Sequence, residues 1–190
     1  AQALPMDART GGILIPATPS ATVTNEKPAN VEFRKGIEAQ LKDEMAAAKN
    51  HFLAAVKLDE KFAPPLIGLA DIALKEGNRI QAENYLRQAE RAAPQAAEVH
   101  LGWGRFYLGA SQFSQAETSF KKARDLNPAS ITPLLELGDL YLKNTSRLDD
   151  AVQAFTTAVA LAPDNKFAVY SLGVASAMAG RRDDATPNEY

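Results

Sequence analysis

A repeated pattern of large and small side chains constrains the fold of this 190-residue chain more than any other feature. The clearest copy spans residues 97–128 and indicates two amphipathic helices, with a break near residues 109–114 and a stop at Asn127-Pro128. The two helices carry, in order, Trp103, Gly104, Tyr107, Ala116, Phe120 and Ala123. Most of the remaining chain repeats this order, so the sequence predicts a stack of similar helix pairs.

The alternation of large and small residues has a physical reason in helix packing. Two antiparallel helices approach closely only where side chains are small, so we expect Gly104 and Ala116 at their contact. Trp103 and Phe120 would fill the wedge between this pair and the next. Pro128 ends the second helix because proline lacks a backbone N–H and clashes with the preceding turn. A unit this small cannot bury its apolar face alone, so neighbouring units must stack on it.

This pattern resembles the tetratricopeptide repeat (TPR). That family places a large residue, a small residue and Tyr in helix A, then Ala, Phe, Ala and a closing Pro in helix B. Residues 97–128 match at each of these places. The resemblance covers about residues 29–185 and implies an all-α fold, a right-handed superhelical solenoid of antiparallel helix pairs with four units and part of a fifth.

The resemblance also divides the chain into segments. We predict an extended Pro/Thr-rich segment at 1–28, a solenoid at 29–185 and a tail at 186–190, with repeats at 29–62, 63–96, 97–130 and 131–165 and a partial repeat at 166–185. The first repeat is the most degenerate, since Lys35 stands where a large apolar residue is usual. The second has its inter-helix turn at Gly77-Asn78. In the fourth, the turn from Asn144 to Arg147 is one residue longer than the pattern.

The fifth unit is irregular. Leu172-Gly173 takes the large and small positions, and Ala185 would open its second helix, preceded by Asp183-Asp184. The apolar run from Phe167 to Tyr170 is unusual for a terminal helix, which normally caps a solenoid with polar residues. We therefore expect either that the natural protein continues or that a partner covers this end.

Composition excludes several classes of function. The formal net charge is −2, so the chain has no electrostatic footprint for nucleic acid or an anionic membrane. The absence of cysteine excludes disulfides, thiol catalysis and zinc–thiolate sites. No apolar run approaches the ~20 residues that span a bilayer, so we expect no membrane insertion.

The N-terminal segment differs from the repeats. Within it, Ile13-Leu14-Ile15-Pro16 forms an apolar knot, which is either an incidental patch or a segment that docks in its own solenoid or a neighbour's. The small residues of Ala1-Gln2-Ala3 favour a processed, exported protein (periplasmic or outer-membrane associated) over a cytoplasmic one.

The sequence contains no set of residues that matches a known catalytic arrangement. His51 and His100 are interpreted as packing or surface residues, and Gly102-Trp103-Gly104 lacks the preceding strand and the following Lys-Ser/Thr of a phosphate loop. The pair Asp149-Asp150 falls at a helix start, where carboxylates complement the helix dipole. The sequence therefore predicts no enzyme activity, no cofactor and no metal site in these residues.

The resemblance instead implies a peptide-binding groove lined by helix A of each repeat. The second, fifth, ninth and twelfth positions of these helices give Phe33, Ile37, Ile67, Asp71, Leu74, Leu101, Arg105, Leu108, Leu135, Asp139, Leu142, Tyr170 and Val174. The groove would be largely apolar, with one charge per central repeat.

Alternatively, Asp71, Arg105 and Asp139 pair with one another across adjacent repeats. The first interpretation predicts that Arg105→Glu leaves folding nearly intact and alters binding. The Lys/Asn/Arg clamp with which some family members hold a carboxylate terminus is missing.

These observations favour a non-catalytic scaffold that binds a protein or peptide segment, in the setting of a bacterial envelope or secretion assembly. Two alternatives stay open. The array is the substrate-recognition arm of a larger enzyme, such as a glycosyltransferase or peptidase. Otherwise it is a self-assembling structural protein, associating through residues 1–28 or the C-terminal end.

Overall fold

The fold is entirely helical in the part of the chain that the computed structural model describes, residues 26–185, with side chains described as far as Gly180. The helices are α1 (Pro28–Leu41), α2 (Met45–Leu58), α3 (Ala63–Lys75), α4 (Arg79–Ala92), α5 (Ala97–Gly109), α6 (Phe113–Leu126), α7 (Thr132–Leu142), the short 3₁₀ helix η1 (Thr145–Arg147), α8 (Leu148–Leu161) and α9 (Lys166–Ala185). The predicted all-α class is confirmed. The apolar knot at residues 13–16 lies outside the described residues.

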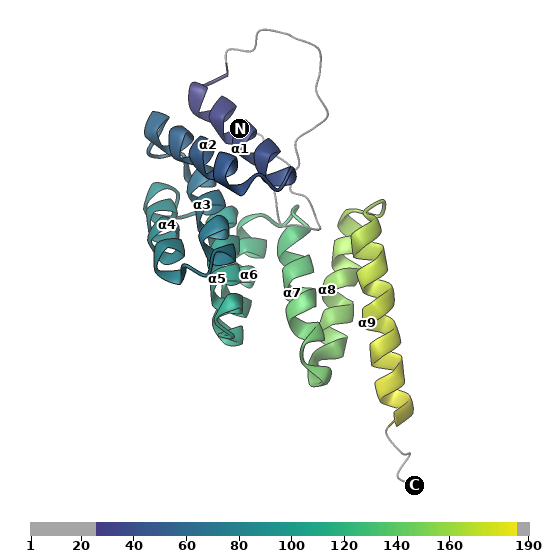
Figure 1. Cartoon of the computed structure of the whole chain (residues 1–190). Coiled ribbons are helices and arrows are strands. Elements are labelled where there is room, and N and C mark those ends of the chain that lie inside the picture. Colours follow the sequence, from purple (N-terminus) through teal and green to yellow (C-terminus); the bar gives the residue numbers. More distant parts are fainter. Residues whose placement is uncertain (1–25, 186–190) are drawn as a thin grey trace.

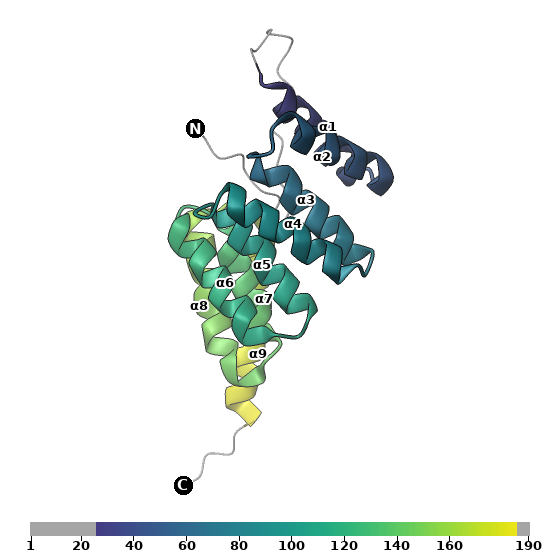
Figure 2. The ribbon, with the colours of Figure 1, turned by 90° about the vertical axis from the view of Figure 1, so that its left-hand side faces the viewer.

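The helices pack as consecutive pairs. α1 packs on α2, α3 on α4, α5 on α6 and α7 on α8, while α9 packs on α8. Each pair contacts the next through the second helix of one and the first helix of the other, and α3 also packs directly on α5. Figures 1 and 2 show the pairs following one another in chain order, from α1 and α2 at one end to α9 at the other. This arrangement is a superhelical stack of helix pairs.

The turns within the first three pairs share one backbone feature. Asp43, Gly77 and Ser111 have φ angles of 62°, 75° and 58°, and they stand at equivalent places in successive repeats. Glycine adopts positive φ freely, whereas the β-carbon of Asp or Ser is strained there. After Gly77, the Asn78 side chain caps α4 by accepting a hydrogen bond from the backbone N–H of Gln81 at 3.1 Å. The turn predicted at Gly77-Asn78 therefore forms.

The longer turn of the fourth pair contains η1. The Asn144 side chain accepts hydrogen bonds from the backbone N–H of Ser146 at 3.0 Å and from its hydroxyl at 2.8 Å. This local capping absorbs the inserted residue and leaves the packing of α7 on α8 intact. The insertion also gives Arg147 a place at the start of α8, next to Asp150.

The core rests on phenylalanine rings that fill the space over glycines. Phe120 and Phe155 are fully buried, and a β-carbon placed on Gly104 or Gly138 would overlap their rings. The ring of Phe52 lies over Gly36 and Gly68 in the same way. The core positions expected in helix B, Ala116 and Ala123, are likewise fully buried, as are their counterparts in the other pairs. Close helix approach therefore explains the small residues, as the sequence predicts.

The C-terminal helix departs from the sequence-based expectation. α9 runs without interruption from Lys166 to Ala185, so Ala185 ends a helix and does not open a second one. One side of α9 is buried by α8 through Ala168, Ser171 and Ala175. On another side, nothing lies within 4 Å of a β-carbon placed on Gly173. Asp183-Asp184 thus stands in the last turn of α9 and not at the start of a second helix.

Candidate protein-binding face

The groove positions predicted from the resemblance divide into buried and accessible residues. Five have less than a tenth of their surface exposed and belong to the hydrophobic core: Phe33, Ile37, Ile67, Leu101 and Leu135. Phe33, for example, packs against the rings of Phe52 and Phe62, with centroids 5.7 and 5.3 Å away. These five side chains support the surface from beneath and offer a ligand little area.

The remaining predicted positions reach the solvent. Leu74, Leu108, Leu142 and Val174 are half-buried, while Asp139 and Tyr170 are exposed, Tyr170 by 70%. The structure brings the accessible positions of α3, α5 and α7 together. We call the surface formed by these three helices the helix-A face; its residues are Asp71, Leu74, Arg105, Leu108, Glu136, Asp139 and Leu142. Tyr170 and Val174 lie on α9 beyond it.

An ion-pair bridge crosses the helix-A face. Arg105 on α5 donates a hydrogen bond from Nη1 to Oδ2 of Asp71 on α3 at 3.2 Å. It donates a second from Nε to Oε1 of Glu136 on α7 at 2.9 Å. The Arg105 side chain is only 16% exposed, so both pairs are largely shielded from solvent. Burial alone would lower the pKa of the Arg105 guanidinium, but the two neighbouring carboxylates have the larger effect, so the pKa is raised.

The bridge agrees in part with the alternative interpretation from the sequence, in which Asp71, Arg105 and Asp139 pair with one another. Asp71 and Arg105 pair across adjacent repeats, as that interpretation expects. The second partner of Arg105 is Glu136, which the position rule misses because it stands at the sixth place of helix A and not at the ninth. A signal was available, since Glu136 precedes Asp139 by about one helical turn and so shares its face.

Asp139 is in a different electrostatic situation. Its side chain is exposed, and it has neither a hydrogen bond nor an ion pair with the residues that the structure describes. Surrounding protein nevertheless strips part of its hydration, and this desolvation, followed by the charge of Glu136, raises the pKa of Asp139 to about 6. Lys143 opposes the shift.

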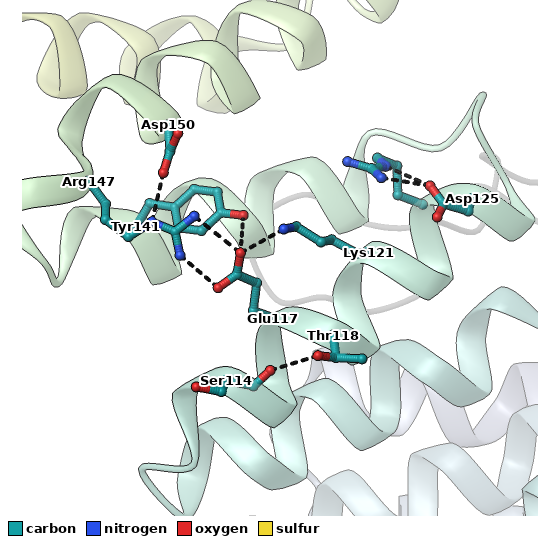
Figure 3. Close-up of polar contacts among 9 residues, drawn as sticks. Ser114, Glu117, Thr118, Lys121, Asp125, Tyr141, Arg147 and Asp150 are labelled. Atoms are coloured by element: carbon teal, nitrogen blue, oxygen red, sulfur yellow. Dashed lines mark hydrogen bonds and ion pairs between the residues drawn. The ribbon is translucent and has the colours of Figure 1, made fainter.

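A second polar cluster, not predicted from the sequence, joins the third repeat to the fourth. Glu117 on α6 accepts hydrogen bonds from Nη1 and Nη2 of Arg147 at 2.7 and 3.1 Å. It also accepts one from the Tyr141 hydroxyl at 2.9 Å and pairs with Lys121 at 2.8 Å. Figure 3 shows these side chains converging on the Glu117 carboxylate, with Asp150 bound to the other edge of Arg147.

This cluster stabilises the negative charge of Glu117. The hydrogen bonds from Arg147, aided by those from Lys121 and Tyr141, lower the pKa of Glu117 to about 2. The guanidinium of Arg147 also lies over the Tyr141 ring, 4.1 Å from its centroid. The cluster fixes α6 against α7 and the η1 turn, so its role is in the geometry of the stack.

The two histidines occupy structural environments. His51 lies 2.7 Å from Glu32, joining α2 to α1, and is partly exposed. His100 is buried, its Nε2 lies 3.1 Å from the Pro94 carbonyl oxygen, and burial lowers its pKa. No group of three or more His, Cys, Asp or Glu within residues 26–180 is placed to hold a metal ion. Both histidines are thus packing or surface residues, as interpreted from the sequence.

The family follows from this fold and its repeating core. A family model described as tetratricopeptide repeat matches residues 67–131, 101–165 and 135–186, which together make up more than half of the chain. The chain therefore belongs to the tetratricopeptide repeat family. Such domains are generally protein–protein interaction modules and are typically non-catalytic. None of the helices in the described part of the chain is long and apolar enough to cross a membrane.

Known relatives share this repeat region. The chain is 29% identical over 136 residues to the Protein O-mannosyl-transferase TMTC3 of Homo sapiens, covering 64% of this chain and 15% of that protein. It is 31% identical over 121 residues to the Peroxisomal targeting signal receptor of Kluyveromyces lactis, covering 63% of this chain and 21% of the receptor. The chain thus spans a small part of the length of these relatives.

A solved structure shows the same fold. Yeast Tom70 superposes with a TM-score of 0.69 at 22% sequence identity, over 83% of this chain and 34% of Tom70. At this identity the likeness concerns the arrangement of the helices.

Proposed function

We propose that this chain is a non-catalytic interaction module that holds a segment of a partner protein along the helix-A face. The observation that carries the proposal is the recurrence of half-buried leucines on three neighbouring helices. Leu74 and Leu108 are the next-to-last residues of α3 and α5, and Leu142 is the last residue of α7, so the three stand at the same place in each repeat. Such a row provides apolar contact at regular intervals, and the charged residues between them fix the register of a bound segment.

The family and one relative support this assignment. Solenoid repeats create extended surfaces for partner binding, and the Kluyveromyces lactis relative is by name a receptor for a targeting signal. The finer setting predicted from the sequence, a bacterial envelope or secretion assembly with an exported protein, stays a prediction. So do the assignment of the exposed Tyr170 to the binding surface and the predicted self-association.

A peptide-display experiment tests the proposal. The protein is used to select peptides from a random library, and the affinity of each selected peptide is measured for the unmodified protein, Leu108→Asn and Leu142→Asn. Leu161→Asn is the matched control, because Leu161 is accessible at the far end of α8. We expect at least tenfold weaker binding to the two helix-A-face variants and unchanged binding to the control. Equal binding to all four proteins, or a library that yields no binder, would overturn the proposal.

A second candidate function is supported by the match to TMTC3, which is by name a transferase. We propose as the alternative that the repeats are the recognition arm of a larger enzyme. The complete reading frame of the natural protein decides between the two. A transferase or peptidase domain encoded beside the repeats would support the arm, whereas a reading frame with repeats alone would contradict it.

A further inference from the structure

The charge balance of the helix-A face points to the chemistry of its ligand. Three carboxylates, Asp71, Glu136 and Asp139, share this face with one guanidinium, that of Arg105. Arg105 is already held between Asp71 and Glu136 at 3.2 and 2.9 Å. Lys75 and Lys143, at the ends of α3 and α7, also act on these carboxylates through space, but neither forms an ion pair with them among the described residues. Asp139 on α7 is therefore the carboxylate of this face that lacks a paired cation.

Asp139 is suited to receive a cation from outside. It is exposed and makes no ion pair with the described residues. Lys143, about one turn further along, acts on Asp139 only through space, and its charge does not offset the desolvation and the charge of Glu136 that raise the pKa of Asp139. Partial desolvation and the charge of Glu136 make its ionised form costly, as its raised pKa shows. A cation brought next to Asp139 would relieve that cost, because an opposite charge favours the ionised carboxyl.

Apolar surface lies next to this carboxylate. Leu142 follows Asp139 on α7 by about one turn, and Leu108 follows Arg105 on α5 by about one turn, where the Arg105 side chain reaches Glu136 on α7. Both leucines are half-buried and so present part of their side chains to a ligand. A ligand that pairs with Asp139 therefore gains apolar contact if it also carries an aliphatic or aromatic side chain.

We propose that the helix-A face binds a peptide segment in which a lysine or arginine pairs with Asp139 and an adjacent apolar side chain contacts Leu108 and Leu142. This inference rests on the proposed function and adds the charge of the partner. Charge complementarity favours a basic segment over an acidic one. An acidic segment would meet three carboxylates, and like charges across an interface strongly disfavour binding. Binding of the cation also displaces the proton from Asp139, so affinity rises as the pH is raised through about 6.

Three peptide libraries of one design test the inference. They differ only in the central residue, which is fixed as Lys, Glu or Leu. Each is selected against the unmodified protein, and the binders are then measured against Asp139→Asn, Leu108→Asn and Asp164→Asn. Asp164→Asn is the matched control, since this exposed carboxylate lies in the turn between α8 and α9.

The inference and the proposed function fail in different ways. We expect binders chiefly from the Lys library, with binding about tenfold weaker to Asp139→Asn, weaker to Leu108→Asn and unchanged for Asp164→Asn. Leu-centred or Glu-centred binders that need Leu108 but ignore Asp139 would overturn this inference and leave the proposed function standing. If no library yields a binder that depends on Leu108, both fail.

Discussion

At Gly138, the backbone of α7 lies directly under the ring of Phe155. A β-carbon at this position would overlap the ring, and the ring is fully buried and has nowhere to move. We expect Gly138→Ala to lower the free energy of unfolding by about 1–3 kcal/mol, because the core must shift to admit one methyl group. Urea denaturation followed by circular dichroism measures the change.

Gly173→Ala is the matched control for this prediction. Gly173 stands at the same repeat position as Gly138, but no atom lies within 4 Å of a β-carbon placed there. Alanine favours helix over glycine by about 0.5–1 kcal/mol, so this variant should be unchanged or slightly more stable. Equal destabilisation by both substitutions would contradict the packing described at Gly138.

Arg105 tests whether the bridge across the helix-A face is structural. We expect Arg105→Ala to lower stability by about 3 kcal/mol, since it leaves Asp71 and Glu136 shielded from solvent without their cation. Its control is Arg87→Ala, because Arg87 forms an exposed pair with Glu83 and its removal should leave stability nearly unchanged. Thermal and urea unfolding give both values, and a stable Arg105→Ala protein would show that the bridge contributes little.

The same burial changes one expectation from the sequence. Arg105→Glu was predicted to leave folding nearly intact, on the view that Arg105 is an accessible groove residue. The Arg105 side chain is only 16% exposed and binds two carboxylates. A glutamate at this position would bring a third carboxylate, which would be unpaired and repelled by the other two. Sequence position identifies which face of a helix a residue occupies, but it does not show which residue from the next helix reaches it.

Among the elements, the joint between α6, α7 and η1 should respond to acid. The pKa of Glu117 is about 2 in the folded protein and 4.5 for an ordinary Glu. A depressed carboxyl pKa stabilises the folded state fully above about pH 4.5, and this stabilisation is lost as the pH falls towards 2. We therefore expect Glu117→Gln to be less stable than the unmodified protein at pH 7 and equal to it near pH 2.

Unfolding curves at pH 7, 4, 3 and 2 measure this difference. Glu83→Gln is the control, because Glu83 holds the same repeat position one unit earlier and pairs with the exposed Arg87. A Glu117→Gln deficit that stays constant from pH 7 to pH 2 would show that the loss comes from packing and not from the charge of Glu117.

The elements show how far the sequence determines the fold. The helix pairs and the glycines under phenylalanine rings were predictable because they depend on residues a fixed distance apart. The end of α9 was not. Gly180 stands at the turn position that Asp43, Gly77 and Ser111 occupy in the first three repeats, yet α9 continues through it. A glycine permits a turn without requiring one, and in those repeats the second helix packs back on the first and stabilises the turn.

For the whole molecule, Asp139 lowers the stability of the fold while serving the proposed binding of a partner. An ordinary Asp ionises near pH 3.8, whereas the pKa of Asp139 is about 6, so between these values the folded state holds more protons than the unfolded state. Stability therefore falls as the pH rises across this interval, and the cost persists at pH 7. We expect Asp139→Asn to be more stable than the unmodified protein at pH 7 and equal to it below pH 3.8.

The measurement is urea unfolding at pH 7, 5 and 3.5, with Asp164→Asn as the control on an exposed turn. A loss of stability in Asp139→Asn at pH 7 would show that the carboxylate has a favourable partner in the fold. A gain combined with the loss of peptide binding would mark Asp139 as a residue that costs stability and serves recognition.

The bridge through Arg105 has a mechanical consequence. One guanidinium ties α3, α5 and α7, which belong to three successive repeats, whereas apolar packing in the stack joins neighbours only. Bending the stack so that α3 and α7 separate must stretch both bonds of this tie, while bending it the other way does not. We therefore expect the stack to resist bending that separates α3 from α7 more than bending in the opposite direction, and a cation that competes for these carboxylates to reduce that resistance.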